Sequence, residues 1–377
     1  MKKQVGRILL ILLLLFCMTA GVANADQSSG TAISSSGKHS VTDMAGRTVD
    51  LPSDVNQVMA LYGPAYEKLV ILDAEDKIAI GADFHKTHAS WAHIIYKYLD
   101  KIPALSNPSE PNVEEVMKED PDVVFYFGND KFTQKMAELG IPVICSTGGA
   151  PKLETLKDQI RLYGAVLGEK ESKLAEDYCS YFDEKLYNIL GKTSFVKDNQ
   201  KPKVYVTSGI PLRTRGGNSM MADTVKKAGG IYVANDLNGT QTINAEQLLT
   251  WNPDIIIIDH APDLPDPSSS ATSNTPDAQS IQKQILTKPE FQGINAVKNK
   301  KVYICPMGAF FWDAGQQGIL QLEWMAKLFH PELFPDLDMK KELKEFYSKF
   351  FRYDLTDEEV ELIMSHKLPP NAEKFGY

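Results

Sequence analysis

Two stretches of the chain share one pattern of polar and apolar positions. NVEEVMKEDPDVVFYF covers residues 112–127 and NAEQLLTWNPDIIIID covers residues 244–259. In both, Asn stands two positions before a glutamate (Glu114 or Glu246), and Pro-Asp follows seven residues after it. The Asn suits a helix start, the residue before Pro leaves helical geometry, and an unbroken apolar run is typical of a strand buried on both faces. We therefore predict an internal duplication of a helix, a turn and a parallel strand.

The alternative is that such a unit is simply frequent in α/β proteins, but the surrounding pattern also alternates strands with helices. Strand-like runs occupy 57–63, 78–83, 141–146, 203–209 and 301–306, and a hairpin is expected at 41–52. Helical patterns occupy 65–77, 131–139, 219–228, 280–286, 319–329 and 338–365. This alternation predicts an α/β fold with two lobes, each a parallel sheet wound with helices, and a ligand cleft between the lobes.

The middle of the chain lacks any strand signal from about Lys152 to Leu190. Apolar side chains recur there at close to helical spacing, as in Tyr178, Phe182 and Leu186. A helix of about 20 residues extends roughly 30 Å, so we predict a rigid helix that joins the lobes; the alternative is a surface helix inside one domain. The predicted organisation is a signal peptide (1–25), a flexible leader (26–40), an N-terminal lobe (41–160), the connecting helix (161–192), a C-terminal lobe (200–330) and a helical extension (331–377).

The N-terminus has the pattern of a secretory signal. Three basic residues within the first seven positions precede the apolar run ILLILLLLF and an Ala-Asn-Ala site, so we predict export across the cytoplasmic membrane to the periplasm with cleavage after Ala25. An uncleaved membrane anchor is less favoured because the apolar run is short for a span. Lipid attachment at Cys17 is not expected, because Phe16 stands where such a site needs a small residue.

Charge and cysteine content narrow the class of protein. Cleavage removes three basic residues and no acidic one, so the formal net charge falls from −9 to about −12, which argues against nucleic acid as a partner. Cys145, Cys179 and Cys305 remain, too widely spaced for a disulfide framework and without a CxxC pair. Cys145 and Cys305 lie in strand-like runs and are expected to be buried, although one disulfide among the three stays open.

Candidate chemistry gathers in the loops after the predicted strands, because wound parallel sheets bind ligands beyond the carboxyl ends of their strands. Aromatic residues, histidines and arginines there suit a bulky, negatively charged ligand between two facing rims. The predicted ligand-binding residues are Tyr62, His85, Trp91, Phe127, Arg213, Arg215, His260, Phe311 and Trp312. The alternatives are that Tyr62 caps a core, that the arginines are solvated, and that His85, His88 and His93 are unrelated to metal, since they lack metal-ligating spacing.

Signatures of catalysis are absent from the sequence, which contains no GxSxG, no HExxH and no phosphate loop. No catalytic residue and no resident cofactor or protein-bound metal is expected. Asp122 and Asp254 of the two Pro-Asp pairs are expected at the opposite end of the strands from the rim, where they serve the helix-to-strand turn.

Together these features resemble the substrate-binding proteins of ABC importers for ferric siderophores, haem and cobalamin. The similarity covers nearly all of the mature chain and rests on the paired units and on RGGNSMMADTVKKAGG (215–230), which is similar to the family's helix-to-Gly-Gly element. The resemblance implies that one glutamate on each lobe docks with arginines of the membrane permease, and the matching positions are Glu114 and Glu246. The alternative for these residues is a helix-dipole preference worth only tenths of a kcal/mol.

The function implied is a monomeric extracytoplasmic receptor that delivers a metal chelate to an ABC permease, with a ferric siderophore, and thus iron, as the first choice. Haem or a corrinoid would use His85, His260 or the aromatic residues, and a molybdate-type oxyanion would use arginines and backbone N–H groups. A bare divalent metal would need about three converging histidines or carboxylates. A chelatase-like enzyme with a similar fold is disfavoured by the signal peptide. Loop 261–279 either covers the cleft or is a disordered insertion.

Overall fold

Each lobe is built on a parallel sheet whose strands are buried. The computed structural model describes residues 32–33 and 38–375, except 62, 83–88, 106–110, 129, 260–276 and 314. The first sheet has the order β6-β5-β4-β7-β8 and the second β11-β9-β13-β14. The strands are β4 (Val58–Ala60), β5 (Ile78–Ala82), β6 (Ala104–Leu105), β7 (Val123–Tyr126), β8 (Val143–Cys145), β9 (Lys203–Ser208), β11 (Ile231–Tyr232), β13 (Ile255–Asp259) and β14 (Val302–Ile304).

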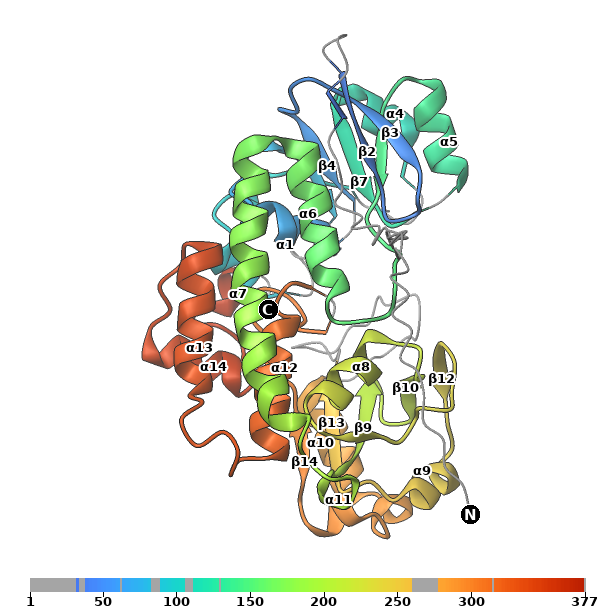
Figure 1. The fold of residues 1–377 in the computed structure, drawn as a ribbon, viewed down its shortest axis with the longest axis vertical. Helices are drawn as coiled ribbons and strands as arrows, with labels where there is room; N and C mark the ends of the chain where they lie inside the picture. Colours follow the sequence, from blue (N-terminus) through green and yellow to red (C-terminus); the bar gives the residue numbers. More distant parts are fainter. Residues whose placement is uncertain are drawn as a thin grey trace, which may run out of the picture.

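Helices cover the faces of these sheets and join the two lobes (Figure 1). The first lobe carries α1 (Gly63–Ile71), α3 (Ala92–Ile95), α4 (Val113–Lys118) and α5 (Asp130–Glu138), and the second carries α8 (Met220–Lys227), α9 (Ala245–Trp251), α10 (Ala278–Thr287), α11 (Asn295–Lys298) and α12 (Gly318–Phe329). The centre holds α6 (Thr155–Leu167) and α7 (Glu169–Thr193). Short 3-10 turns are η1 (Glu75–Lys77), η2 (Leu99–Lys101), η3 (Asp198–Gln200), η4 (Pro289–Phe291) and η6 (Ala372–Phe375). The predicted two-lobed α/β class is confirmed.

The predicted duplication is visible in the hydrogen bonds of the two units. The side chain of Asn112 accepts from the backbone N–H of Glu114, and the side chain of Asn244 caps α9 by accepting from the backbone N–H of Gln247. In the turns, the carboxylate of Asp122 accepts from the N–H of Gln57 at 2.9 Å. The carboxylate of Asp254 accepts from the N–H of Lys203 at 3.0 Å. Both aspartates therefore fix the amino end of the neighbouring strand, which confirms that they are turn residues rather than an acid/base pair.

The connection between the lobes is a pair of helices rather than one. The sequence predicts a single connecting helix over 161–192, but the chain breaks at Gly168, whose φ of 134° lies in the left-handed region that favours glycine. The helix after this break, α7, has 25 residues and is about 37 Å long. It packs against α6 on one side and against α8 and α12 of the second lobe, so one rigid element runs along both lobes (Figure 1).

Two small antiparallel sheets stand outside the parallel sheets. The expected hairpin is formed by β2 (Lys38–Thr42) and β3 (Thr48–Pro52), and Gly46 in its turn has a φ of 77°. The predicted flexible leader covers 26–40, but within it Ala32–Ile33 form β1 and residues 38–40 begin β2, with which β1 pairs. The second sheet pairs β10 (Arg213–Arg215) with β12 (Thr240–Thr242), which α8 and β11 separate in the chain, and the sequence does not predict it.

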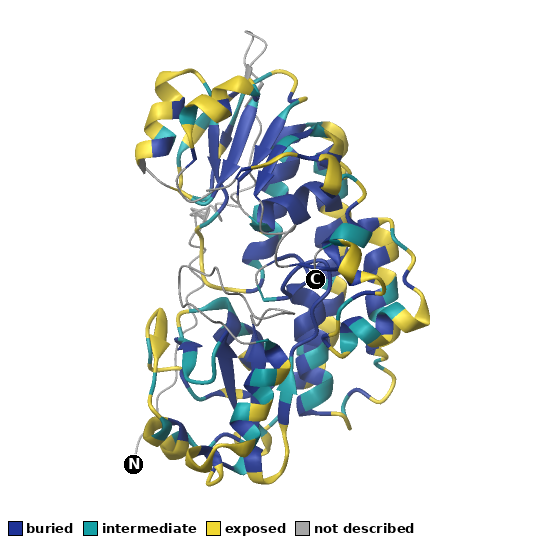
Figure 2. Cartoon of the chain, turned by 180° about the vertical axis from the view of Figure 1, so that it is seen from behind, coloured by how far each residue is buried: buried dark blue, intermediate teal, exposed yellow. Residues whose placement is uncertain are grey.

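The C-terminal extension is a helical layer built into the main core. It contains α13 (Met339–Phe346), the π-helical turn η5 (Tyr347–Phe351) and α14 (Asp357–Met364). Phe346, Tyr347 and Phe350 belong to the large buried cluster that also includes residues of both lobes. Figure 2 shows the resulting pattern, in which the strands and the inner helices are buried and the outer helices of each lobe are exposed. Cys145, Cys179 and Cys305 are free and buried.

Candidate functional site

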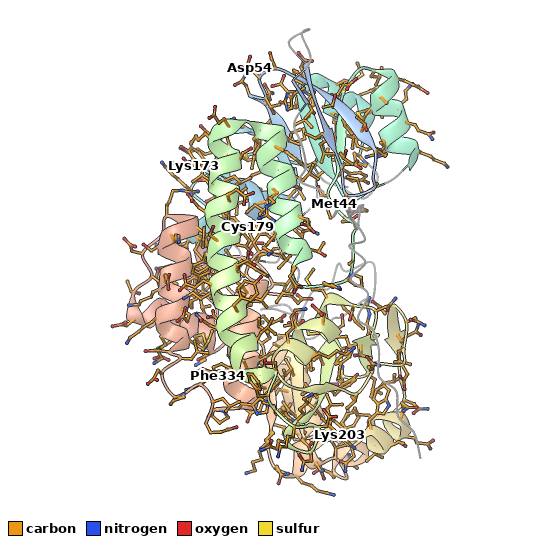
Figure 3. The ribbon with its side chains drawn as sticks, in the orientation of Figure 1. Met44, Asp54, Lys173, Cys179, Lys203 and Phe334 are labelled. Atoms are coloured by element: carbon orange, nitrogen blue, oxygen red, sulfur yellow. The ribbon has the colours of Figure 1, made fainter. Side chains whose placement is uncertain are left out.

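The carboxyl ends of the two sheets face each other across the middle of the molecule. In Figure 3, Asp54, shortly before β4, and Lys203, the first residue of β9, lie at opposite far ends, so the strands run inwards from both lobes. The strand order reverses between β4 and β7 in the first lobe and between β9 and β13 in the second. Ligands of open α/β sheets bind outside the carboxyl ends at such reversal points, which places the candidate site between the two rims.

On the second-lobe rim, the antiparallel pair of β10 and β12 presents a polar face. Thr214 points inwards, since it is fully buried and its hydroxyl donates to the carbonyl of Val206 at 2.7 Å. Side chains alternate along a strand, so Arg213 and Arg215 share the other face. Their cross-strand partners are Thr242 and Thr240. The face therefore combines two guanidinium groups with two hydroxyls.

The two arginines differ in their electrostatic environment. Arg215 forms an ion pair with Asp313, whose side chain is 1% exposed, and the carboxylate of Asp259 also lies in its field. The attraction of Asp313 raises the pKa of the Arg215 guanidinium above its ordinary value. The charge of Arg215 is therefore already balanced by Asp313. This ion pair joins β10 to the loop that follows β14.

Arg213 and Trp312 carry hydrogen-bond donors that have no acceptor in the described chain. Arg213 is half-buried and its guanidinium forms no hydrogen bond or ion pair with the residues that the structure describes. Trp312 is 1% exposed, and its indole N–H also lacks a partner. A buried donor without an acceptor costs about 1–3 kcal/mol, which applies to the Trp312 indole, whereas the half-buried guanidinium of Arg213 keeps its donors available for an acceptor from outside the chain.

Phe310 and Phe311 directly precede Trp312 in the loop after β14. Both are buried, at 4% and 6% exposed, and their rings pack at 5.8 Å with an interplanar angle of 61°. We predict from the sequence that at least one of these three aromatic residues faces a cleft or solvent, but all three are buried in this structure. All three side chains are buried because the loop folds over the main hydrophobic core, to which they belong.

The first-lobe rim contributes a hydroxyl and a partly buried ring. Phe127 follows β7, and its carbonyl accepts a hydrogen bond from the Thr147 hydroxyl at 2.6 Å. Ser146, the residue before Thr147, is buried, and its hydroxyl shares a 2.6 Å hydrogen bond with the hydroxyl of Tyr163. Gly148 must stay a glycine here, because its φ is 140° and a Cβ would lie 2.2 Å from the carbonyl oxygen of Met44. The two strand-end loops therefore hold each other in place.

A buried carboxylate links the first lobe to the aromatic loop of the second. Both oxygens of Glu67, on α1, accept hydrogen bonds: one from the N–H of Gln316 at 2.6 Å and one from the side chain of Gln317 at 2.9 Å. Burial raises the pKa of Glu67, whereas these donors and Lys68 oppose that rise. Gly315 allows the approach, since a Cβ there would lie 1.9 Å from a carboxylate oxygen. Sequence reasoning missed Glu67 because it occupies an ordinary position within an apolar helix.

Trp91 is not at an open rim, which corrects its predicted placement. Its ring is fully buried and its indole N–H donates to the carbonyl of Lys367 at 2.9 Å, because the C-terminal extension packs over it. His93 is also engaged, with Nδ1 2.6 Å from a carboxylate oxygen of Asp100. Tyr62, His85 and His260, and most of loop 261–279, lie outside the described residues.

Metal ligation by the protein itself finds no support in the described part of the chain. No group of three or more histidine, cysteine or carboxylate side chains there is arranged to hold a metal ion. The rim is instead a set of hydrogen-bond donors, aromatic rings and one balanced ion pair. The donors among these described residues suit the acceptor atoms of a ligand.

The geometry defines a two-lobed α/β binding protein with its site at the facing rims. A family model described as "Periplasmic binding protein" matches residues 58–308, and the chain belongs to this family. Its members are binding proteins, so the chain is not an enzyme, and the chelatase-like alternative falls. The protein is the solute-binding component of an ABC importer, with a small-molecule ligand and a membrane permease as its partners.

Individual relatives differ in what they bind. The molybdate-binding protein MolA of Haemophilus influenzae is 25% identical over 343 residues, which cover 83% of this chain and 90% of MolA. The haem uptake protein IsdE of Staphylococcus aureus is 27% identical over 213 residues, covering 55% of this chain and 67% of IsdE. The crystal structure of a periplasmic solute binding protein from Veillonella parvula is 29% identical, with a TM-score of 0.70, covering 86% of this chain and 96% of that one.

The helices of the described residues can be compared with what a membrane span requires. Among them, no helix combines the length and the apolar character that crossing a bilayer requires. The predicted signal peptide lies in residues 1–25, outside the part of the chain that the structure describes.

Proposed function

We propose that this protein captures an anionic metal-containing ligand between its lobes and delivers it to the permease, with a ferric siderophore as the first candidate. The observation that carries the proposal is the pair of donors without acceptors on the second-lobe rim, the Arg213 guanidinium and the Trp312 indole N–H. Guanidinium groups bind carboxylate and other oxyanions through two parallel hydrogen bonds. Siderophores present such oxygen atoms around the metal, so the protein contacts the chelate and not the iron.

The charge balance of the rim favours Arg213 over Arg215 as the ligand contact. Arg215 would have to leave Asp313 before it could bind an anion, and breaking a buried ion pair is costly. Arg213 has no such partner among the described residues and shares its face with the hydroxyls of Thr240 and Thr242. The predicted roles of Phe127, Phe311 and Trp312 remain part of the proposal, as do those of Tyr62, His85 and His260.

A molybdate-type oxyanion is the second candidate, and one observation favours it. The relative named for molybdate binding matches over 83% of this chain, whereas the relative named for haem uptake matches over 55%. A tetrahedral oxyanion suits a guanidinium with N–H and hydroxyl donors. It would need the lobes to converge on a small ligand, while a siderophore would fill the space between them.

Delivery would use Glu114 and Glu246 on the outer surface of the lobes. Both side chains are exposed at the start of equivalent helices, α4 and α9. We propose that each takes a basic side chain of the permease. Reversal of both charges, E114K with E246K, is expected to abolish uptake while leaving ligand affinity unchanged; unchanged uptake would remove the docking role.

The ligand class is tested by calorimetric titration of the mature protein with one panel. The panel contains a ferric catecholate, a ferric hydroxamate, haemin, cobalamin, molybdate and nickel chloride. We expect saturable binding of a ferric siderophore; binding of molybdate alone selects the second candidate, and binding of bare nickel alone contradicts both. R213Q is expected to weaken the bound member by about 10- to 100-fold, the worth of hydrogen bonds to a charged group. The matched control is R161Q, on α6, whose arginine pairs with Glu176.

Two further parts of the proposal concern the mature form. We propose that the chain is exported to the periplasm, cleaved after Ala25 and monomeric, without a lipid at Cys17. Mass spectrometry of the exported protein checks the first residue and the absence of lipid, and light scattering checks the mass. A mature mass that includes residues 1–25 would favour the membrane anchor instead.

A further inference from the structure

Large apolar side chains are exposed at equivalent positions of the two repeat copies. Six such residues are exposed in the described chain, namely Met117, Leu139, Tyr187, Phe195, Ile231 and Leu249. Met117 is the sixth residue of NVEEVMK and Leu249 is the sixth of NAEQLLT. Their exposed fractions are 47% and 38%. Single exposed apolar residues are common in proteins, but their recurrence at the same place in both lobes calls for a shared cause.

Core packing does not supply that cause. The residues just before them, Val116 and Leu248, are the ones that these helices bury, at 0% and 1% exposed. The neighbouring positions on the same helices, such as Glu115 and Thr250, are polar and exposed. A polar side chain at Met117 or Leu249 would therefore be compatible with the fold.

Each apolar side chain stands beside the glutamate of its own helix. Met117 follows Glu114 by three residues and Leu249 follows Glu246 by three. Residues three apart are neighbours on a helix surface, so each lobe presents a carboxylate and an apolar group together. Figure 1 places α4 and α9 on the same side of the molecule, one on each lobe and opposite α7, and Figure 2 shows exposed surface on both.

We infer that Met117 and Leu249 form the apolar half of a two-point docking surface for the permease. The inference rests on the proposed function and adds to it the composition of the contact. The expected partner is the permease, with two equivalent contact sites. Each contact site is expected to hold a basic side chain surrounded by apolar residues. The charge of Glu114 and Glu246 is complementary to such a group, and the duplication in this chain matches a partner built from two equivalent halves.

The apolar groups strengthen the ion pairs by excluding water. The aliphatic stem of an arginine or lysine packs along an apolar side chain while its charged end reaches a carboxylate. Contacts that surround a charged pair and keep out water raise its contribution, since exposed ion pairs are worth little. Glutamate alone on an open surface would give a weak, salt-sensitive contact.

The test measures the affinity of the mature protein for the importer encoded with it, reconstituted in lipid nanodiscs, by surface plasmon resonance. The test variant is M117S with L249S, which leaves every charge in place. The matched control is Y187S with F195S, two more exposed apolar residues, at 65% and 82%, that lie at the end of α7. Both double variants are expected to keep the melting temperature of the wild type, because none of the four side chains is buried.

The expected result is a loss of affinity of about tenfold or more for M117S/L249S, the equivalent of about 1.4 kcal/mol, with no change for Y187S/F195S. Equal affinity of the two double variants would overturn the inference. If E114K/E246K loses binding while M117S/L249S does not, the docking proposed above stands and only the apolar half falls. If the wild type itself fails to bind the importer, the proposed delivery function falls as well.

Discussion

The indole N–H of Trp91 donates a hydrogen bond to the backbone carbonyl of Lys367, 276 positions later in the chain, over 2.9 Å. His366, the residue before Lys367, places its Nδ1 2.8 Å from the carbonyl of Cys305, just after β14. Two consecutive residues of the extension therefore hold the first lobe with one bond and the second lobe with the other. The extension, which the sequence placed simply after the second lobe, is a strap across both.

This strap predicts that Trp91 matters for stability beyond its volume. W91F leaves the Lys367 carbonyl without its donor and removes ring volume from the core, so we expect a loss of about 2–3 kcal/mol. Urea unfolding measures it. W324F is the control, since Trp324 is only partly buried and its indole forms no hydrogen bond with the described residues; an equal loss in both variants would show that ring volume alone decides.

Glu67 and Glu323 are both buried, yet amidation is expected to change stability much more at Glu67 than at Glu323. E67Q puts an amide where both carboxylate oxygens accept N–H donors, so we expect a loss of about 2–4 kcal/mol. In Glu323, burial raises the pKa well above the ordinary value and one oxygen has no partner. E323Q should therefore change stability by less than about 1 kcal/mol. Chemical denaturation of the two variants at pH 7 decides, and a larger loss in E323Q would contradict the assignment.

The ion pair between Arg215 and Asp313 should behave as a unit. R215Q removes the counter-charge of a carboxylate that is 1% exposed, and we expect a loss of about 2–4 kcal/mol in stability. Addition of D313N should restore part of that loss, because the buried charge then disappears as well. The coupling energy from the double-mutant cycle of unfolding free energies measures this. A coupling energy near zero would mean that the two groups act independently.

Glu75 makes stability depend on pH. Burial raises the pKa of its carboxyl to about 7, so the folded state holds this proton more tightly than the unfolded chain. Its contribution is fully present below about pH 4.5 and is lost as the pH rises through about 7. E75Q should remove about 1–3 kcal/mol of that decline. Urea midpoints from pH 5 to pH 8 test this against E290Q, a change at an exposed residue; parallel curves for wild type and E75Q would refute it.

Local patterns were enough for most of the fold, and long-range contacts account for what they missed. The Asn caps, the Pro-Asp turns and the apolar runs of the two units predicted both sheets, since each signal lies within a few residues of the structure it specifies. Gly168 was read as part of a helix because only its φ reveals the break. The antiparallel pair of β10 and β12 joins residues far apart in sequence, and neither strand carries an alternating pattern of its own.

In the candidate site, even more depends on long-range contacts that local sequence patterns do not reveal. Arg213 and Arg215 have equal weight in the sequence, and only the position of Asp313, from a distant loop, separates a balanced arginine from one without a partner in the described chain. Trp91 has the composition of a rim residue but is covered by a segment almost at the end of the chain. Glu67 sits between apolar neighbours, and nothing before the folded state indicates that two glutamine residues converge on it.

The three buried thiols have a consequence for life outside the cytoplasm. Cys145, Cys179 and Cys305 are unpaired, and burial raises the pKa of Cys179 to about 12 and that of Cys305 well above its ordinary value. Thiolate is the reactive form, so the thiols of Cys179 and Cys305 resist oxidation and exchange. The described part of the chain therefore holds its fold without a disulfide, and we expect its stability to be the same in reducing and in oxidising surroundings.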